Sequence, residues 1–382
     1  MTSEFQTCPY QEKCGGCSFR QLSFADYQKN KAAQVAKILA PLGNLKWGAP
    51  VFIPDGQRRR ASLAFCYKKG IITFGFNRRQ SDELVDIAEC KLLTPRLNEN
   101  LGHLREMLTE ICRVPILIPQ KKGKKPIQKY ISQGDVWVCD ADNGVDVVLE
   151  FDENLELEQR MLIFEKTQAL PDIIRVSHRR KNNSLSEPIV EKSKPYIRIG
   201  KNDVFIPAGT FLQATKASEQ AMISLVLSYL KGTTGKIADL FCGVGTFSYP
   251  LSEYKENQIL SIDSSSDLLA GFKQSINKNM ISNITILERN LFKYPLDGDE
   301  LSGFEALVFD PPRAGAEAQV RSIVNSPSKP TKIVAVSCNP HSFVKDAQIL
   351  CAGGYSLEEV TLIDQFTYSN HSELVALFTL KK

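Results

Sequence analysis

The chain has 382 residues, 43% of them hydrophobic, and a formal net charge of +4 at pH 7. This length and composition are typical of a globular protein with a sizeable core, and we expect two domains. The sequence contains no run of about eighteen apolar residues and no basic-then-apolar signal at its N-terminus, which excludes a helical membrane protein from the candidate classes. We therefore expect a cytoplasmic protein.

Three cysteines lie close together near the N-terminus. Cys8, Cys14 and Cys17 form a C-x5-C-x2-C pattern around two glycines, and Cys90 is the candidate for a fourth ligand. Close-spaced cysteines in an intracellular protein are typical of a metal site. Four thiolates fit tetrahedral zinc or an iron-sulfur cluster, and spacing alone does not distinguish them. In either case the metal would tie the N-terminal arm to a distant hairpin.

The first half of the chain predicts a helix, antiparallel strands and a second helix. The expected elements are a helix over 23–42, strands over 59–87 with turns at 69–70 and 77–80, a helix over 98–109 and a strand-rich segment over 136–151. These assignments follow from apolar spacing and from turn-forming residues. The polar stretch 179–194 is expected to be a surface loop, and the domain boundary to lie near Gly200.

Basic residues are concentrated in the same half. Residues 1–200 hold 31 Lys and Arg against 24 Asp and Glu, whereas residues 201–382 hold 16 against 19. The basic clusters are Arg58–Arg60, Arg78–Arg79, Lys121–Lys125 and Arg179–Lys181. Such clusters favour binding of a polyanion, because each neutralised phosphate releases counterions. The aromatic residues near them, Phe65, Tyr67, Phe74 and Phe76, are candidates to stack on unpaired bases. Solvated loops and the inner face of a sheet are the alternatives.

The second half alternates between strands and helices. We expect helices over 218–230 and 266–280, and strands over 236–241, 259–262, 307–310, 333–337 and 374–380. Alternation of this kind predicts a doubly wound α/β sheet with right-handed crossovers. Ligands bind such sheets at the carboxyl ends of the strands.

A glycine-containing loop follows the first of these strands. Within 239–245, Gly243 lets a ligand approach the backbone, and Asp263 at the end of the next strand can accept hydrogen bonds from a ribose. The loop lacks the third glycine of a dinucleotide fingerprint and the Gly-Lys-Ser/Thr of a phosphate loop. The pattern instead suits S-adenosylmethionine, whose sulfonium cation matches the acidic Asp239 and Asp310.

A cysteine stands at the end of a later strand. Cys338 follows the apolar run 333–337 and precedes turn-forming residues, which argue against burial in the core. Glu373 is a candidate base, and Asp310 begins an Asp-Pro-Pro-Arg motif after another strand. In proteins generally, a buried cysteine is more often a small packing residue than a nucleophile. That is our interpretation of Cys66, Cys112, Cys139 and Cys351.

In this order the motifs resemble one family, the RNA uridine-5-methyltransferases that act on 23S rRNA and tRNA. The matching motifs are Cys8, Cys14 and Cys17 with Cys90, residues 75–79 and 87–90, residues 211–213, 239–245, 310–313 and 337–340, and residues 371–373. The resemblance implies a class I S-adenosylmethionine-dependent methyltransferase domain over 201–382. A smaller mixed α+β domain over 1–200, binding an iron-sulfur cluster and RNA, would precede it.

The resemblance also implies a role for each matching residue. Cys8, Cys14, Cys17 and Cys90 would hold a [4Fe-4S] cluster, which favours iron-sulfur over zinc. Gln213, Phe241, Gly243, Asp263 and Asp310 would bind the methyl donor or the base, and Arg313 is a candidate to stabilise an enolate. Cys338 would be the nucleophile and Glu373 the base. The family usually has glutamate where this chain has Asp263, which shortens the reach to the ribose.

The expected reaction explains why a cysteine and a base are needed. Uracil C5 is a weak nucleophile, so a thiolate adds to C6 and the resulting enolate attacks the methyl group; a base then removes the C5 proton. We expect a monomer that methylates a loop uridine of 23S rRNA. The alternatives are the same reaction on tRNA, a non-catalytic RNA-binding assembly factor, and a methyltransferase acting on amino groups.

Overall fold

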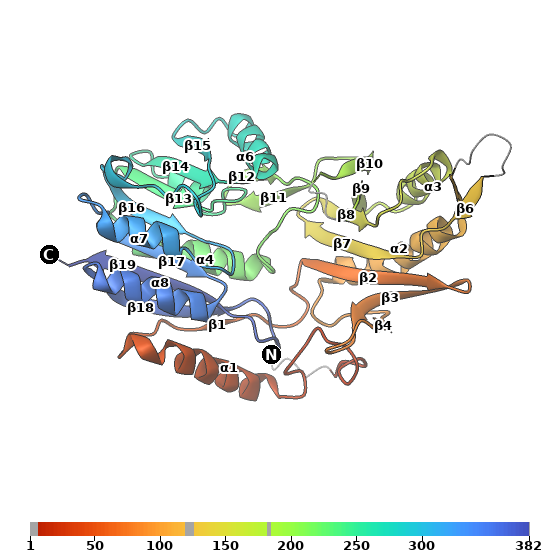
Figure 1. Ribbon diagram of the computed structural model, residues 1–382, viewed down its shortest axis with the longest axis horizontal. Helices are drawn as coiled ribbons and strands as arrows, with labels where there is room; N and C mark the ends of the chain where they lie inside the picture. Colours follow the sequence, from red (N-terminus) through yellow and green to blue (C-terminus); the bar gives the residue numbers. More distant parts are fainter. Residues whose placement is uncertain (1–6, 119–125, 182–184, 382) are drawn as a thin grey trace. The chain divides into compact units, whose positions relative to one another are not determined.

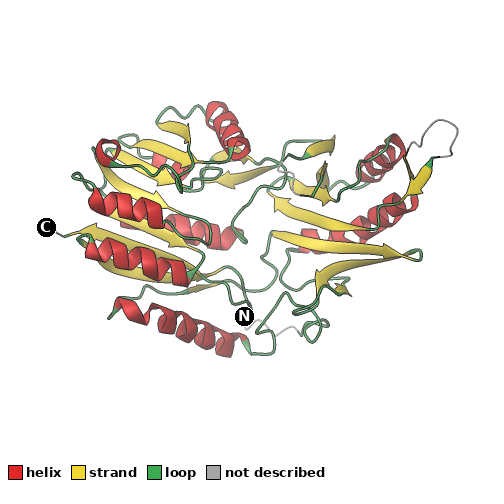
Figure 2. Ribbon diagram, viewed as in Figure 1, coloured by secondary structure: helices red, strands yellow, loops and turns green. Residues whose placement is uncertain are grey.

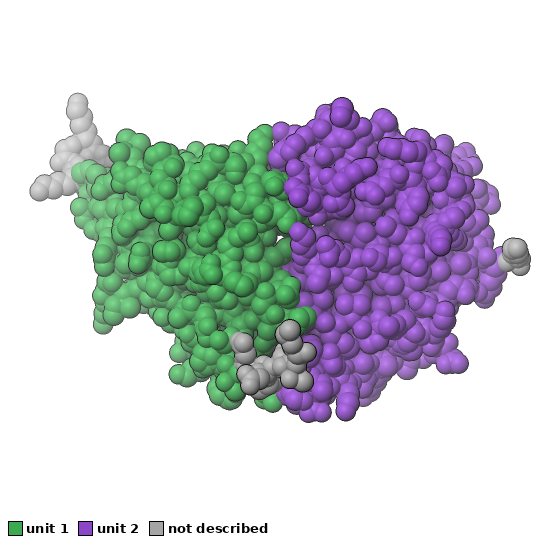
Figure 3. All heavy atoms as spheres, turned by 180° about the vertical axis from the view of Figure 1, so that it is seen from behind, with its two compact units in different colours: residues 1–21, 54–197, 207–212 green, residues 22–53, 198–206, 213–382 purple. Residues whose placement is uncertain are grey.

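The computed structural model describes residues 7–118, 126–181 and 185–381 (Figure 1). The chain divides into two compact units, coloured separately in Figure 3. Unit 1 comprises residues 1–21, 54–197 and 207–212, and unit 2 comprises residues 22–53, 198–206 and 213–382. The sequence suggested two contiguous domains, 1–200 and 201–382. The units differ from this division chiefly in residues 22–53.

Helix α1 (Phe24–Leu39) accounts for that difference. Ser23 caps the helix by accepting a hydrogen bond from the Asp26 backbone N–H, and a short 3-10 turn, η1 (Ala40–Leu42), follows it. Val35 and Leu39 are buried in the core of unit 2. Helix α1 confirms the helix predicted from apolar spacing, but the core that buries these residues is formed largely by the C-terminal half of the chain.

Unit 2 is built on an eight-stranded sheet with the order β1-β18-β19-β17-β16-β13-β14-β15. The strands are β1 (Val51–Phe52), β13 (Lys236–Leu240), β14 (Gln258–Asp263), β15 (Ile284–Glu288), β16 (Phe304–Phe309), β17 (Lys332–Ser337), β18 (Tyr355–Asp364) and β19 (Glu373–Leu380). β13 to β17 pair in parallel, whereas β19 runs antiparallel to both of its neighbours. The predicted doubly wound α/β sheet is confirmed, with the addition of this antiparallel strand.

Helices alternate with the strands of this sheet (Figure 2). They are α4 (Lys216–Tyr229), α5 (Ser248–Ser252), α6 (Ser266–Lys278), the short 3-10 turn η2 (Gly298–Leu301), α7 (Glu317–Asn325) and α8 (Pro340–Ala352). The helices expected over 218–230 and 266–280 correspond to α4 and α6. Among the helices in the described part of the chain, none has the length and apolarity needed to cross a membrane.

Unit 1 contains a seven-stranded sheet with the order β10-β9-β8-β7-β2-β3-β4. Its strands are β2 (Arg60–Lys68), β3 (Ile71–Asn77), β4 (Leu84–Asp86), β7 (Gln133–Ala141), β8 (Gly144–Glu150), β9 (Ile173–Arg179) and β10 (Glu187–Glu191). Helices α2 (Pro95–Arg113) and α3 (Leu157–Gln168) share one apolar core with this sheet. A small hairpin, β5 (Ile116–Ile118) and β6 (Ile127–Lys129), completes the unit.

One expectation for this unit was wrong. Residues 179–194 were expected to form a loop, but Glu187–Glu191 is strand β10, which pairs antiparallel with β9. The strand lies at the edge of the sheet, and only Val190 of its residues is fully buried. An edge strand with so little buried surface has little apolar periodicity, so its sequence resembles that of a loop.

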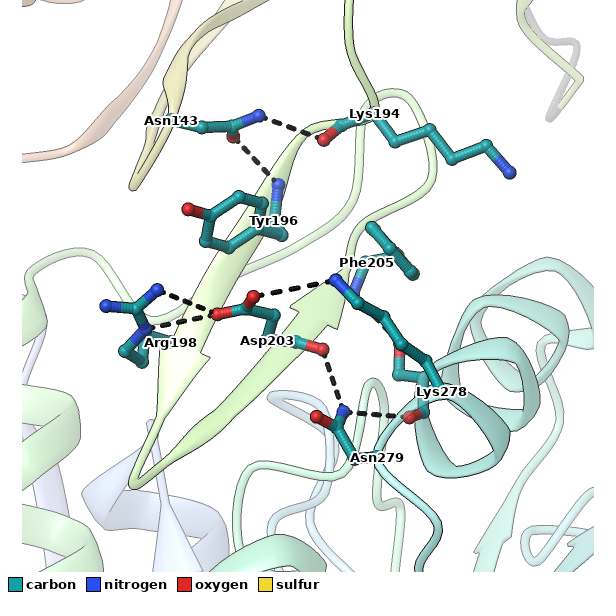
Figure 4. Close-up of polar contacts among 9 residues, drawn as sticks. Asn143, Lys194, Tyr196, Arg198, Asp203, Phe205, Lys278 and Asn279 are labelled. Atoms are coloured by element: carbon teal, nitrogen blue, oxygen red, sulfur yellow. Dashed lines mark hydrogen bonds and ion pairs between the residues drawn. The ribbon is translucent and has the colours of Figure 1, made fainter.

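The boundary between the units falls inside the hairpin of β11 (Tyr196–Ile199) and β12 (Asn202–Phe205). In unit 1, Asn143 accepts a hydrogen bond from the Tyr196 N–H and donates one to the Lys194 carbonyl (Figure 4). In unit 2, the Asp203 carboxylate binds Arg198 at 3.0 Å and Lys278 at 3.5 Å. Each half of the hairpin is thus fixed to its own unit by polar contacts.

Candidate active site

The candidate catalytic residues of unit 2 come together where two neighbouring strands, β16 and β17, end and a third, β19, begins. Cys338 directly follows β17, and Asp310 directly follows β16. Glu373 is the first residue of β19, which pairs antiparallel with β17. Ser337 pairs with Leu374 in this antiparallel pair. Cys338, which follows Ser337, and Glu373, which precedes Leu374, therefore lie at the same edge of the sheet. The pairing of β17 with β19 thus brings together two residues that are far apart in the sequence.

The thiol of Cys338 lies close enough to two carboxylates to be affected by their charge. Burial raises the pKa of Cys338 to about 12, and the negative charges of Glu373 and Asp310 add to this shift, while Arg313 opposes it. The thiol is therefore protonated at neutral pH in the ligand-free protein. Cys338 is half-buried, whereas Glu373 is 2% exposed.

Two glutamine side chains connect the carboxylates. The Gln213 amide donates to Asp310 Oδ2 at 2.9 Å, and the Gln365 amide donates at 2.7 Å to both Gln213 Oε1 and Glu373 Oε2. Gln365 Oε1 in turn accepts a hydrogen bond from the Ala214 N–H at 2.7 Å. All these groups are fixed by partners before any ligand binds. Gln365 was missed from the sequence because it follows β18, a strand that was not predicted.

Helix α1 holds the loop that leads to Glu373. Lys31, which is 1% exposed, donates to the backbone carbonyl oxygens of Ser369 and His371 and lies 3.6 Å from Asp364. Tyr27 donates a hydrogen bond to the same carboxylate at 2.8 Å. Burial lowers the pKa of Lys31, and the charge of Asp364 opposes this shift. An N-terminal helix thus fixes the backbone immediately before the candidate base.

The loop after β13 has the geometry expected of a binding loop. Phe241, Gly243 and Gly245 have positive φ angles of 59°, 55° and 92°. The Gly243 N–H donates to Asp263 Oδ2 at 3.0 Å, and the Ser265 N–H donates to Asp263 Oδ1 at 2.9 Å. Asp263 therefore fixes the loop that precedes it. A side chain at Gly245 would collide with the Phe272 ring, whose nearest atom would lie 2.5 Å from the added Cβ.

Two aspartates in this region are shifted toward the protonated form. Burial raises the pKa of Asp239 to about 7, and the hydrogen bond from Ser248 opposes this shift. Burial likewise raises the pKa of Asp310 to about 7, against the hydrogen bond from Gln213. Asp239 is fully buried, whereas Asp310 is partly exposed. Both groups would be stabilised as anions by a cationic ligand.

The pKa of Asp239 gives a prediction for the ligand-free protein. The unfolded chain releases this proton near pH 4 and the folded protein retains it to about pH 7, so ionisation removes stability as the pH rises through this window. Asp239→Asn carries no proton to lose. The free energy of unfolding, measured by urea titration, should fall less with rising pH in this variant than in the wild type. The difference between the two should grow by a few kcal/mol from pH 4 to pH 7, on the order of the pKa shift. Exposed Asp267→Asn is the control; parallel curves for Asp239→Asn and the wild type would contradict the assignment.

The four candidate metal ligands lie in unit 1, where burial and the charges of neighbouring cysteines raise the pKa values of Cys14, Cys17 and Cys90. Burial, together with the charges of Cys90, Cys14 and Cys8, raises the pKa of Cys17 to about 12. Within residues 7–118, 126–181 and 185–381, no group of three Cys, His, Asp or Glu side chains is arranged to hold a metal ion. The chemistry of the donor set nevertheless fits a cationic centre, because thiolates that repel one another need a positive charge between them.

Protein contacts hold the N-terminal arm near the β3–β4 turn. The Gly15 N–H donates to the Asn77 carbonyl at 2.9 Å, Arg79 donates to the Cys17 carbonyl at 2.7 Å, and the Tyr10 hydroxyl accepts from the Ala88 N–H. A side chain at Gly15 would approach the Asn77 oxygen to 2.9 Å. The expected attachment of the arm to a distant hairpin is thus present in the protein contacts themselves.

The basic clusters differ in their surroundings. Arg59 is 4% exposed and its neighbours Arg58 and Arg60 are half-buried, so this cluster is not a solvated loop. Burial lowers the pKa of Arg58, and the charges of Cys90 and Cys17 oppose this shift. Arg78 and Arg79 are exposed. The cluster Lys121–Lys125 lies outside the described residues.

Comparison with known proteins gives consistent relationships. The family model described as tRNA (Uracil-5-)-methyltransferase matches residues 196–381. An uncharacterized RNA methyltransferase of Brucella melitensis is 36% identical over 379 residues, covering 97% of this chain and 83% of that protein. The 23S rRNA (uracil(1939)-C(5))-methyltransferase RlmD of Aeromonas hydrophila is 30% identical, covering 98% of this chain and 82% of that protein.

A solved structure has the same fold. The crystal structure of the Pyrococcus abyssi tRNA (uracil-54, C5)-methyltransferase in complex with S-adenosyl-L-homocysteine matches with a TM-score of 0.72, over 98% of this chain and 87% of that chain. Sequence identity over this match is 22%, so the likeness concerns the fold. It confirms the expected α/β architecture.

Proposed function

The chain belongs to the RNA uracil-5-methyltransferase family, and on this premise we propose that it methylates C5 of a loop uridine in 23S rRNA, acting as a cytoplasmic monomer. S-adenosylmethionine is the methyl donor. The observation that carries the proposal is the common position of Cys338, Glu373 and Asp310 at one edge of the sheet. The similarity to the Aeromonas hydrophila enzyme supports 23S rRNA, and the family description keeps tRNA as the second candidate.

In the proposed mechanism, Cys338 acts in the first step of the reaction and Glu373 in the last. The Cys338 thiolate adds to uracil C6, and the enolate so formed attacks the methyl group of S-adenosylmethionine through C5. The bond between this methyl group and the sulfonium sulfur breaks, and S-adenosylhomocysteine leaves. Glu373 then removes the C5 proton, the double bond re-forms between C5 and C6, and the bond between C6 and sulfur breaks. The product is 5-methyluridine, and the thiolate is regenerated.

The raised pKa of Cys338 requires that ligand binding changes the charge around the thiol. Glu373 and Asp310 both disfavour the thiolate. A sulfonium cation near Asp310 would offset part of this negative charge and so favour ionisation of the thiol. In this proposal the methyl donor or the uracil base is bound by Gln213, Phe241, Gly243, Asp263 and Asp310. Gln365 positions Glu373 and Gln213 through its two hydrogen bonds.

Nucleoside analysis tests the proposal. RNA from a strain that lacks the gene would be incubated with purified protein and S-adenosylmethionine, with 23S rRNA and tRNA in separate reactions. We expect 5-methyluridine to appear in 23S rRNA alone. Its appearance in tRNA alone would move the substrate to the second candidate, and methylation of an amino group would contradict the reaction itself.

We also propose that Cys8, Cys14, Cys17 and Cys90 hold a [4Fe-4S] cluster. The support is the resemblance of the motif and the raised pKa values of Cys14, Cys17 and Cys90, which burial and the charges of neighbouring cysteines cause. When bound, such a cluster would supply a cationic core that keeps four thiolates together. The chain's own contribution is to bring an N-terminal arm and the turn before α2 to one place.

Iron content tests this part of the proposal separately from activity. Protein purified without oxygen should be brown and contain about four iron atoms per chain. Cys17→Ser should lose most of the iron and unfold at a lower temperature, because metal binding contributes to folding free energy. Cys66→Ser, a half-buried cysteine outside the motif, should keep its iron. Stoichiometric zinc in place of iron would contradict the assignment.

A further inference from the structure

The seven-stranded sheet of unit 1 has two different faces. Alternate residues of its strands join the core with α2 and α3, among them Leu63 and Phe65 of β2 and Val136 and Val138 of β7. The residues between them point to the other face, because side chains alternate along a strand. On the central strand β7 that face carries Asp135, Trp137 and Cys139. We call it the open face.

Trp137 is the prominent aromatic side chain of the open face. It lies on the fourth of the seven strands and is 36% exposed, although an indole ring is normally mostly buried. The Arg179 guanidinium lies 5.5 Å from the centre of its ring, and Glu150 fixes that arginine by accepting from Nε at 2.7 Å. A cation held by its own carboxylate thus orients an exposed ring.

The open face is hollowed on both sides of Trp137. One hollow, of about 70 Å³, is lined by Trp137 together with Arg60, Val148 and Phe211. Phe211 is 62% exposed, and the Arg60 guanidinium lies 4.0 Å from the centre of its ring. This end of the face therefore offers a second aromatic ring and a second arginine.

The other hollow is larger and polar, with a volume of about 390 Å³. Small residues on adjacent strands leave the space: Ala64 of β2 pairs with Gly75 of β3 on one side and with Asp135 of β7 on the other. Arg78 and Arg79 line the same hollow from the β3–β4 turn, and both are exposed. Its volume is in the range of ligand pockets.

From this arrangement we propose that the open face binds single-stranded RNA, with one base stacked on Trp137 and a neighbouring nucleotide in the 390 Å³ hollow. The proposal rests on the proposed function for its choice of RNA as the ligand. Exposed aromatic rings between arginines suit unpaired bases and phosphates, because bases stack on rings and phosphates bind guanidinium groups. Arg78 and Arg79 would contact the phosphates, and the Asp135 carboxylate would accept a hydrogen bond from a base.

The chain contains only two tryptophans, which makes the stacking directly measurable. In Trp47→Phe, Trp137 is the remaining indole and reports on the open face. Its fluorescence should fall and reach a plateau on titration with an oligocytidylate of about ten nucleotides. In Trp137→Phe, with Trp47 as the remaining indole, fluorescence should stay constant. Unchanged fluorescence of Trp47→Phe under conditions where labelled oligocytidylate binds would overturn the proposal.

Affinity provides the second measurement. Trp137→Leu should weaken binding of labelled oligocytidylate roughly 5- to 100-fold, while the salt dependence stays the same because no phosphate contact is removed. Trp47→Leu, at a 40% exposed tryptophan of unit 2, is the matched control and should bind as the wild type does. Wild-type affinity of Trp137→Leu would overturn the proposal. If this variant does not fold, the quenching of Trp47→Phe decides.

The probe separates this proposal from the proposed function. Oligocytidylate contains no uridine, so its binding is independent of methyl transfer. If the wild type binds oligocytidylate with quenching of Trp137 but forms no 5-methyluridine, the open face stands and the reaction fails. If 5-methyluridine forms normally and Trp137 is not quenched, the reaction stands and the open face fails.

Discussion

Replacing Cys338 by alanine should abolish methyl transfer, with a loss on the order of 10^4-fold or more in rate, because C6 addition precedes every later step. Binding of S-adenosylmethionine should persist, since the loop 239–245 and Asp263 are untouched. The measurements are incorporation of labelled methyl into RNA and equilibrium binding of the methyl donor.

Cys351→Ala is the matched control for this experiment. Cys351 lies in α8, the helix that follows Cys338, and is partly buried. Its replacement should leave methyl transfer at the wild-type level. A Cys338→Ala enzyme that keeps activity within about tenfold of the wild type would remove the thiol from the mechanism.

Replacing Glu373 by glutamine should block the reaction after methylation. The amide cannot take the C5 proton, so a methylated adduct between Cys338 and RNA should accumulate and turnover should fall by roughly 10^2- to 10^4-fold. The adduct would appear as a slowly migrating band on a denaturing gel, labelled by the donor's methyl group. Exposed Glu358→Gln on β18 is the control and should turn over normally.

The same variant should change the reactivity of Cys338. The Glu373 charge raises the pKa of this thiol, so its removal should lower the pKa and increase the fraction of thiolate at neutral pH. Alkylation of Cys338 by iodoacetamide in ligand-free protein should therefore be faster in Glu373→Gln than in the wild type. Equal alkylation rates together with normal turnover would show that Glu373 contributes to neither step.

The sequence predicted β13, β14, β16 and β17, four of the parallel strands of the unit 2 sheet, because they are apolar runs that end at polar residues. Ile333–Ser337 and Leu307–Phe309 are examples, and their ends locate Cys338 and Asp310. The edge strand β15 was not predicted. Strand β18 was missed. It bends at a bulge between Leu357 and Glu359, where two glutamates interrupt its apolar pattern.

The parts of the site that depend on tertiary contacts could not be read from the sequence. Gln365 has no distinctive local pattern, and its role as a link depends on contacts with Gln213 and Glu373, which lie far from it or across a turn. The sequence gives Lys31 the pattern of an ordinary exposed helix residue, although its side chain is buried against the loop before Glu373. Neither position has a periodicity or spacing signal, since partners distant in the chain create both environments.

The candidate metal ligands, unlike Gln365 and Lys31, have a clear spacing signal in the sequence. The spacing of Cys8, Cys14 and Cys17 predicted a cysteine cluster, and Cys90 is close enough in the fold for its charge to affect Cys17. The half-buried setting of Arg58 could not be foreseen, because a run of three arginines is typical of an exposed surface. Only the fold shows that the charges of two of these cysteines act on it.

The central claim is that Cys338 forms a covalent bond with C6 of the uridine that is methylated. RNA containing 5-fluorouridine tests it most directly, because a fluorine at C5 cannot be removed as a proton and elimination is blocked. Wild-type protein incubated with this RNA and S-adenosylmethionine should give a complex that resists denaturation. Mass spectrometry of its peptides should find a methylated 5-fluorouridine nucleotide on Cys338. Absence of the complex, or attachment at another cysteine, would contradict the account.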